Sequence, residues 1–440
     1  METIKNLVIG FGKGGKTLAK TLAQHGEAVM VVEQSSQMYG GTCINVGCLP
    51  SKNMIINSER HLPFAEGVAH QNALTDRLRN KNYHMLADEP TVEVVDGKAR
   101  FIGNHQVEIE LVNGDHRQVE AERIFINTGA QSVIPDIPGL TLGERIITSK
   151  EALSLPYQPQ TMAILGAGHI GLEFASMYHQ YGTDVTVINR HDHILNHYDR
   201  DVAEMVEQDL INAGIRLRMN TNLVQVEATA DQVTLTFDNG ESQTVDALLV
   251  ASGRRPNTAD LGLENTGIQL TSRGAIQVNE RLETAVPNVW AIGDVNGGPQ
   301  FTYISLDDFR IINNQLFGDQ TRSTKDRFAV PASTFLTPPL SSVGLSEETA
   351  RAQGYNIKVY QQAAAGIPKA HVMEETRGLY KVIVDQDTQE ILGAVIYAAE
   401  SHEVINIVAL AMKTHQPYSV LRDMIYTHPT MAEVFNDLLK

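Results

Sequence analysis

Cysteine is almost absent from this sequence. The chain of 440 residues contains two, Cys43 and Cys48, which is too few for the disulfide framework of a secreted scaffold of this size. A zinc site is excluded as well, because two further ligands at suitable spacing are missing. Any importance of the pair must therefore lie in its own chemistry.

Long apolar runs and an excess of basic charge are also missing. No stretch of about 18 uninterrupted apolar residues occurs, and the first apolar stretch, residues 6–15, is broken by glycines and Lys13 and leads to no cleavage site. The 35 Lys and Arg against 52 Asp and Glu give a net charge of −17, without a cationic stripe that could follow a phosphate backbone. We expect a cytoplasmic protein that spans no membrane and binds no nucleic acid.

The composition is that of a folded protein with several domains. Hydrophobic residues make up 42% and charged residues 20% of the chain, which disfavours disorder, collagen and solenoid repeats. At roughly 150 residues per domain, the length predicts two to four domains.

The first pattern with a chemical meaning lies near the start of the chain. An apolar run leads into Gly10, Gly12 and Gly15, and helical periodicity follows, so the glycines join a strand to a helix. Such a GxGxxG turn admits a pyrophosphate to the backbone and to the helix N-terminus. We expect Glu33, at the end of the next strand, to bind the adenosine ribose hydroxyls; the alternative is a solvated carboxylate.

The same pattern recurs at Gly166, Gly168 and Gly171 and predicts a second dinucleotide site. Its second strand ends at Asn189 and Arg190, where a carboxylate would suit a free ribose hydroxyl. A cationic, donor-rich tip favours the 2′-phosphate of NADPH. The alternative is that Arg190 is merely exposed and that NADH serves as well.

The rest of the chain reads as strands with a few helices. Short strands are predicted at 91–111, inside the first unit, and a comparable β segment at 223–253 follows the second. Beyond Pro331, two strands and a helix at 402–415 predict an α+β domain.

The segment around the two cysteines carries the strongest signal. Cys43 and Cys48 are close enough to bridge a tight loop at the predicted start of a helix, where the helix dipole lowers a thiol pKa. A redox-active pair is the interpretation that remains. Near the C-terminus, His428 is followed by Glu433; a lone histidine before proline is usually structural, whereas a carboxylate partner lets it hold the proton of a dithiol exchange.

Together these motifs resemble the class I flavoprotein disulfide reductases, which include glutathione reductase, lipoamide dehydrogenase and mercuric reductase. The resemblance implies FAD at the first glycine motif, NAD(P)H at the second, and a redox disulfide at the cysteines. Cys48 would face the flavin and Cys43 the acceptor, with a Lys52–Glu173 ion pair near the flavin. The other cofactor-binding residues that it implies are Gly41, Thr42, Lys52, Thr128, Gly129, Gly253, Gly293 and Asp294.

The resemblance also implies the architecture. It predicts an α/β fold with two Rossmann-like dinucleotide-binding domains and a C-terminal α+β dimerisation domain. The expected ranges are 1–155 for the FAD domain with the redox disulfide, 156–275 for the NAD(P)H domain, 276–330 for a return to the FAD or central domain, and 331–440 for dimerisation. His428 and Glu433 would serve the cysteines of the partner, which makes the functional unit a homodimer.

Two segments indicate a subgroup within the family. Residues 79–88 and 300–310 resemble the reactive-chlorine-resistance flavoproteins, a bacterial subgroup associated with copper(II) reduction. The tip at Arg190 resembles the NADPH-using glutathione reductases, although Asn196 replaces their second phosphate-binding arginine. We assign no metal ligand from the sequence.

The expected activity is NADPH-dependent reduction of a small acceptor, with copper(II) preferred, in oxidative or reactive-chlorine stress defence. A glutathione-type or lipoamide-type disulfide reductase is the alternative with the same chemistry. A flavin-bound redox sensor, whose cysteines signal without turning over, is the alternative from another class.

Overall fold

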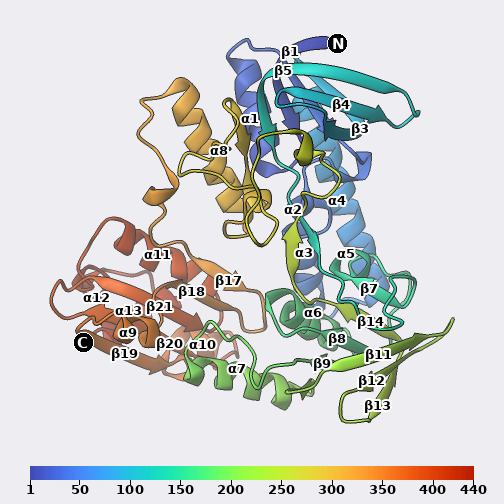
Figure 1. Cartoon of the computed structure of the whole chain (residues 1–440). Coiled ribbons are helices and arrows are strands. Elements are labelled where there is room, and N and C mark those ends of the chain that lie inside the picture. The colour runs from blue at the N-terminus through green and yellow to red at the C-terminus, as the bar shows by residue number, and fades with distance from the viewer.

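The first glycine motif lies at the edge of a six-stranded sheet in the computed structural model, which describes residues 1–440 (Figure 1). The sheet closes on itself, because β1 pairs in parallel with both β2 and β5 while β3 and β4 join these two strands. Its strands are β1 (Glu2–Ile9), β2 (Val29–Glu33), β3 (Val92–Phe101), β4 (Gln106–Leu111), β5 (His116–Ile126) and β16 (Val289–Ala291).

Helices cover this sheet and frame the cysteines. Strand β2 is buried at every position, as its uninterrupted apolar run predicts for a parallel strand covered on both faces. The last part of the unit, β16 and the helix after it, comes from far along the sequence. The helices are α1 (Lys13–Gln24), α2 (Thr42–Asn45), α3 (Cys48–Glu59), α4 (Phe64–Ala87) and α8 (Thr302–Phe317).

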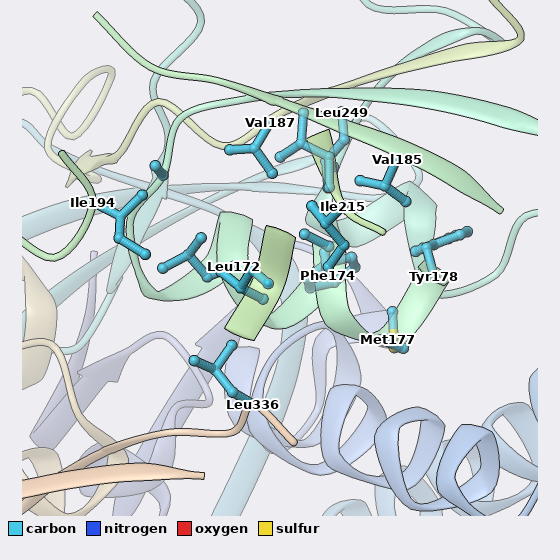
Figure 2. Close-up of a cluster of buried hydrophobic side chains, with 14 of the residues drawn as sticks. Leu172, Phe174, Met177, Tyr178, Val185, Val187, Ile194, Ile215, Leu249 and Leu336 are labelled. Carbon is cyan, nitrogen blue, oxygen red and sulfur yellow. The ribbon is translucent and has the colours of Figure 1, made fainter. Parts of the chain in front are cut away.

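The second glycine motif belongs to an all-parallel sheet of five strands in the order β10-β9-β8-β14-β7. Helix α6 packs its apolar residues against this sheet, where Leu172, Phe174, Val187 and Leu249 lie in one buried cluster (Figure 2). The elements are β7 (Ile146–Thr148), α5 (Ser149–Ala152), β8 (Thr161–Leu165), α6 (His169–Gln180), β9 (Asp184–Ile188), α7 (Arg200–Ala213), β10 (Arg216–Arg218) and β14 (Ala247–Val250).

Two smaller sheets complete the nucleotide-binding part. An antiparallel sheet follows the second unit and contains β11 (Leu223–Ala228), β12 (Val233–Phe237) and β13 (Ser242–Val245). Where the chain passes between the two units, β6 (Ala130–Ser132) pairs with β15 (Arg254–Pro256). These two connecting segments, which are far apart in the sequence, therefore lie side by side.

The C-terminal part is an antiparallel sheet in the order β17-β18-β21-β20-β19, with helix α11 packed on it. The elements are β17 (Ala332–Thr334), β18 (Leu340–Gly344), α9 (Glu347–Ala352), β19 (Ile357–Ala363), α10 (Pro368–Val372), β20 (Leu379–Asp385), β21 (Ile391–Tyr397), α11 (Ser401–Lys413), α12 (Ser419–Asp423) and α13 (Phe435–Leu438).

The predicted fold class is confirmed: two dinucleotide-binding α/β units and a C-terminal α+β unit are present. The exact boundaries at residues 155, 275 and 330 stay predictions. No helix combines the length and the apolar character that crossing a bilayer requires.

Candidate active site

The two cysteines lie on consecutive helices. Cys43 belongs to the single turn α2, and Cys48 is the first residue of α3, with Gly47 before it. The half-buried Cys43 and the exposed Cys48 are both free thiols in this structure. The sequence predicted a helix start for the pair, and Cys48 occupies that position, where unpaired backbone N–H groups favour a thiolate.

The two sulfurs differ in acidity. The pKa of Cys48 is lowered to about 6, chiefly because the Cys43 thiol donates a hydrogen bond to it; Thr302 and the charge of Lys52 also favour the thiolate. The same hydrogen bond, together with burial, raises the pKa of Cys43. Cys48 therefore ionises first, and Cys43 keeps its proton.

Thr302 is a contact of the thiolate that the sequence analysis did not name. Its Oγ1 lies 3.6 Å from the Sγ of Cys48, and it is the first residue of α8. Residues 300–310 carry part of the resemblance to the subgroup, but a contact between positions 254 residues apart leaves no signal in motif spacing. The segment therefore contributes directly to the redox centre.

Thr302→Val removes a hydroxyl that stabilises the thiolate, and loss of one hydrogen bond to a charged group should raise the pKa of Cys48 by about one unit above its value near 6. The thiolate absorbance of the reduced enzyme, followed against pH, measures the shift. Thr321→Val, in an exposed loop after α8, is the control, and an unshifted midpoint in Thr302→Val would remove Thr302 from the site.

Lys52 and Glu173 form an ion pair near Cys48. Lys52 Nζ lies 2.6 Å from Glu173 Oε2, and the other carboxylate oxygen of Glu173 accepts a hydrogen bond from Phe335 N at 2.9 Å. Lys52 also lies over the Phe335 ring, 4.6 Å from its centroid. The pair thus joins α3, α6 and the start of the C-terminal part at the redox centre.

The residues of the first glycine motif fit FAD. Gly10 has φ +99°, and a Cβ there would lie 2.4 Å from Asn127 O, so only glycine keeps the backbone open for a pyrophosphate. The Asn127 side chain fixes the turn, because it accepts from Gly15 N at 3.0 Å and donates to Ile292 O at 2.7 Å. The sequence did not predict this role for Asn127.

Two carboxylates suit the polar parts of the same cofactor. Glu33 ends β2, is buried, and accepts hydrogen bonds from Phe11 N and Ser35 N. Asp294 is half-buried and makes no hydrogen bond to another side chain, and burial raises the pKa of both carboxyls. Carboxylate oxygens that still have free lone pairs in this site can accept hydrogen bonds from the hydroxyl groups of a bound ligand.

The remaining residues predicted for FAD gather around this cradle. The loop at Gly41 abuts the glycine motif, since a Cβ on Gly41 would lie 2.7 Å from Gly12 Cα, and Thr42 begins α2 beside it. Thr128, the residue before Gly129, donates a hydrogen bond from Oγ1 to Asn257 O at 2.8 Å. Gly293 N donates a hydrogen bond to the Asp308 carboxylate at 2.6 Å.

The second glycine motif has the same local geometry. Gly166 has φ +115°, and a Cβ there would lie 2.5 Å from Ala251 O. Ala251 is two residues before Gly253, so this motif packs against the segment that contains Gly253. Gly168 caps α6 and Gly171 lies in its first turn.

The strand tip beside this motif is rich in histidine. Asn189 Nδ2 donates to His193 O at 2.9 Å, and Arg190 Nε donates to His191 Nε2 at 3.2 Å. His191 belongs to the donor-rich tip that the sequence predicts, whereas His193, on the other side of Asp192, was not predicted. No group of three His, Cys, Asp or Glu side chains in the structure is arranged to hold a metal ion.

The C-terminal dyad is formed within the chain. His428 Nδ1 lies 3.0 Å from Glu433 Oε2, with the imidazole 72% exposed and the carboxylate 16% exposed. No hydrogen bond or ion pair connects the dyad to Cys43 or Cys48 of the same chain. An oriented imidazole therefore faces away from the packed interior.

Two dinucleotide-binding units that meet at a dithiol define a nucleotide-dependent oxidoreductase. Residues 4–308 match the pyridine nucleotide-disulphide oxidoreductase family, and residues 330–439 match the dimerisation domain of that family. The chain belongs to this family, whose members use FAD and NAD(P)H. The predicted family is thereby confirmed.

Individual relatives agree with this family assignment. The probable pyridine nucleotide-disulfide oxidoreductase RclA of Escherichia coli is 47% identical over 438 residues, covering 100% of this chain and 99% of that protein. A mercuric reductase of Staphylococcus aureus is 32% identical, covering 97% of this chain and 80% of that protein. Copper(II) complexes of E. coli RclA, described as an HOCl-induced flavoprotein disulfide reductase, and of its C43S mutant each superpose with a TM-score of 0.97 at 46% identity, covering 100% of this chain and 99% of theirs.

Proposed function

We propose that this chain is an FAD-containing, NADPH-dependent reductase that passes electrons through Cys48 and then Cys43 to copper(II), as part of oxidative or reactive-chlorine stress defence. The observation that carries the proposal is the asymmetric thiol pair, in which Cys48 ionises easily beside the Lys52–Glu173 pair and Cys43 does not. The likeness to the HOCl-induced RclA supports the physiological context. We place the protein in the cytoplasm.

Each predicted site residue has a task in this proposal. FAD would be held by Gly10, Gly12, Gly15, Glu33, Gly41, Thr42, Lys52, Thr128, Gly129, Gly293 and Asp294, and NADPH by Gly166, Gly168, Gly171, Asn189, Arg190 and Gly253. Bound FAD supplies two-electron transfer between the nicotinamide and the cysteine pair. Lys52, oriented by Glu173, keeps a positive charge beside Cys48 and so stabilises its thiolate.

The protons of the dithiol need a separate acceptor. Glu433 orients the His428 imidazole through Nδ1, so that Nε2 is available to hold a proton. We assign this dyad to the cysteines of the partner subunit, in keeping with the matched dimerisation domain. The proposed domain limits remain 1–155, 156–275, 276–330 and 331–440.

The coenzyme assignment depends on Arg190. Arg190→Glu would set a carboxylate against the 2′-phosphate, and we expect the preference for NADPH over NADH to fall about ten- to hundredfold. Steady-state kcat/KM values with the two coenzymes measure this ratio. Arg216→Glu, at the far end of the adjacent strand β10, is the charge-matched control. An equal loss with both coenzymes would make Arg190 structural.

Copper(II) suits a dithiol as acceptor because thiolates are soft ligands that select copper(I). Two copper(II) ions each take one electron, the Cys43–Cys48 dithiol becomes a disulfide, and two protons leave. The C43S mutant of E. coli RclA still forms a copper(II) complex, so binding and reduction are separate questions. Reduction is the property that requires both sulfurs.

Reduction of a small disulfide is the second candidate, since relatives of about the same length include a glutathione reductase of Burkholderia cepacia, 31% identical to this chain. Anaerobic turnover with NADPH should be compared for copper(II), oxidised glutathione and lipoamide. Copper(II) should give the highest kcat/KM. A far better rate with either disulfide would transfer the assignment to that acceptor, and one round of reduction without turnover would indicate a sensor.

A further inference from the structure

A buried lysine lies beside the cysteine loop without a carboxylate partner. Lys16 is on α1, is 4% exposed, and its Nζ donates to Gly40 O at 3.4 Å and to Asn82 Oδ1. Both acceptors are neutral. Lysine is almost never fully buried unless its charge is compensated, so the position of this ammonium requires an explanation.

Helix α4 contacts both Lys16 and the helix that contains Cys43. Asn82 is on α4, within the unusual segment 79–88, and its amide is oriented by donation to Leu78 O at 2.7 Å. One turn earlier, Arg79 Nε donates to Asn45 Oδ1 at 2.9 Å, which fastens α4 to α2. The segment thus fixes Lys16 and the helix of Cys43 on one scaffold.

Cys43 lies three residues after Gly40, whose carbonyl Lys16 contacts, and the side chain of its neighbour Ile44 lies against Gly40. Of the groups that can carry a negative charge, Cys43 is the one that acts on Lys16. The charge of Lys16 lowers the pKa of Cys43, and Cys43 in turn raises the pKa of Lys16. Burial, with the charge of Lys13, acts in the opposite direction and brings the pKa of Lys16 down to about 8. The charge of Lys52 likewise lowers the pKa of Cys48. Each thiol therefore has one nearby lysine whose positive charge favours its thiolate form.

We propose that Lys16 is the counter-charge of Cys43: a positioning residue that allows the outer thiol to ionise although Cys48 beside it already carries a negative charge. Without it, a dithiolate would place two like charges together in a half-buried site. This inference rests on the proposed role of Cys43 as the thiol that meets the acceptor. A purely structural lysine would tie Gly40 to α4 and leave the acidity of Cys43 unchanged.

Alkylation of Cys43 tests the inference without any acceptor. In FAD-loaded Cys48→Ser protein, Cys43 is the single remaining thiol, and its reaction with iodoacetamide can be followed by mass spectrometry across a pH series. The charged and titratable groups that act on the cysteine pair are Lys16, Lys52, Glu173, Arg254 and Tyr303, and Lys13 acts on Lys16.

Adding Lys16→Met should raise the pKa of Cys43 by about one to three units. Each unit lowers the thiolate fraction tenfold near neutral pH, while the more basic thiolate is more nucleophilic, so the alkylation rate should fall about three- to thirtyfold. Lys16→Arg should restore most of the rate. Lys20→Met, on the same helix and paired with Glu89, should not change it.

A folded, FAD-loaded Lys16→Met protein that alkylates at the rate of its Cys48→Ser parent would overturn the inference. If Lys16→Met does not fold, Lys16→Gln, which keeps a hydrogen-bond donor toward Gly40 and Asn82, takes its place in the same comparison. An unchanged alkylation rate in that protein would equally reject the proposal. A failure of the copper assignment leaves this readout untouched.

Discussion

Cys43→Ser protein is expected to show a long-wavelength absorption band without any reductant. Removal of the outer sulfur leaves Cys48 as a thiolate, because Thr302 and Lys52 continue to favour its ionised form, and a thiolate beside oxidised flavin gives a charge-transfer band. The hydrogen bond from Cys43 is lost with the substitution, so the midpoint of the band against pH should lie above 6. Absorbance spectra of the purified flavoprotein across pH measure it.

Cys48→Ser is the matched control and should be plain yellow at every pH. In that variant the remaining thiol is Cys43, which lies in α2, outside α3, and has its pKa raised in the native pair. A plain Cys43→Ser protein together with a banded Cys48→Ser protein would reverse the roles of the two cysteines. The spectra therefore decide the order of electron transfer without an acceptor.

Mixing a Cys43→Ser chain with a His428→Ala chain should restore activity that neither has alone. If the dyad serves the cysteines of the partner, one site of the mixed dimer contains both lesions and the other contains none. Random exchange between two-fold dimers then yields about one quarter of wild-type activity. Turnover is measured before and after verified subunit exchange.

The control places both lesions in one chain and mixes it with Cys43→Ser protein. No intact site can then form, and activity should stay at background. If the first mixture also stays at background after proven exchange, the dyad does not act across the dimer. Such a result would leave the exposed His428–Glu433 pair without the assigned task.

Local patterns made much of the site predictable. The first glycines of both motifs adopt positive φ and pack against another backbone, and a turn with these requirements leaves a periodic mark in the sequence. His428 and Glu433 are five residues apart and meet across one turn of chain. Such features depend on short segments, whose geometry follows from their own residues.

Contacts between distant segments were not predictable. Thr302 reaches Cys48 because β16 returns the chain to the first sheet and α8 packs on α1, and no spacing rule connects positions so far apart. Lys16 occupies a helix that looked like ordinary motif periphery. Its burial results from the position of α4, whose sequence resembled a subgroup without revealing which residues it would touch.

Electron transfer to copper(II) through the cysteine pair is tested most directly by anaerobic turnover of NADPH with copper(II) in wild-type and Cys43→Ser protein. NADPH absorbance follows the oxidation of the coenzyme, and a copper(I) chelator follows the formation of copper(I). We expect two copper(I) ions for each NADPH in the wild type, because the dithiol delivers two electrons. In Cys43→Ser, copper(I) formation should fall to background. Nonspecific reduction by the flavin would survive the substitution. Wild-type copper turnover in Cys43→Ser would contradict the claim that electrons leave through the cysteine pair.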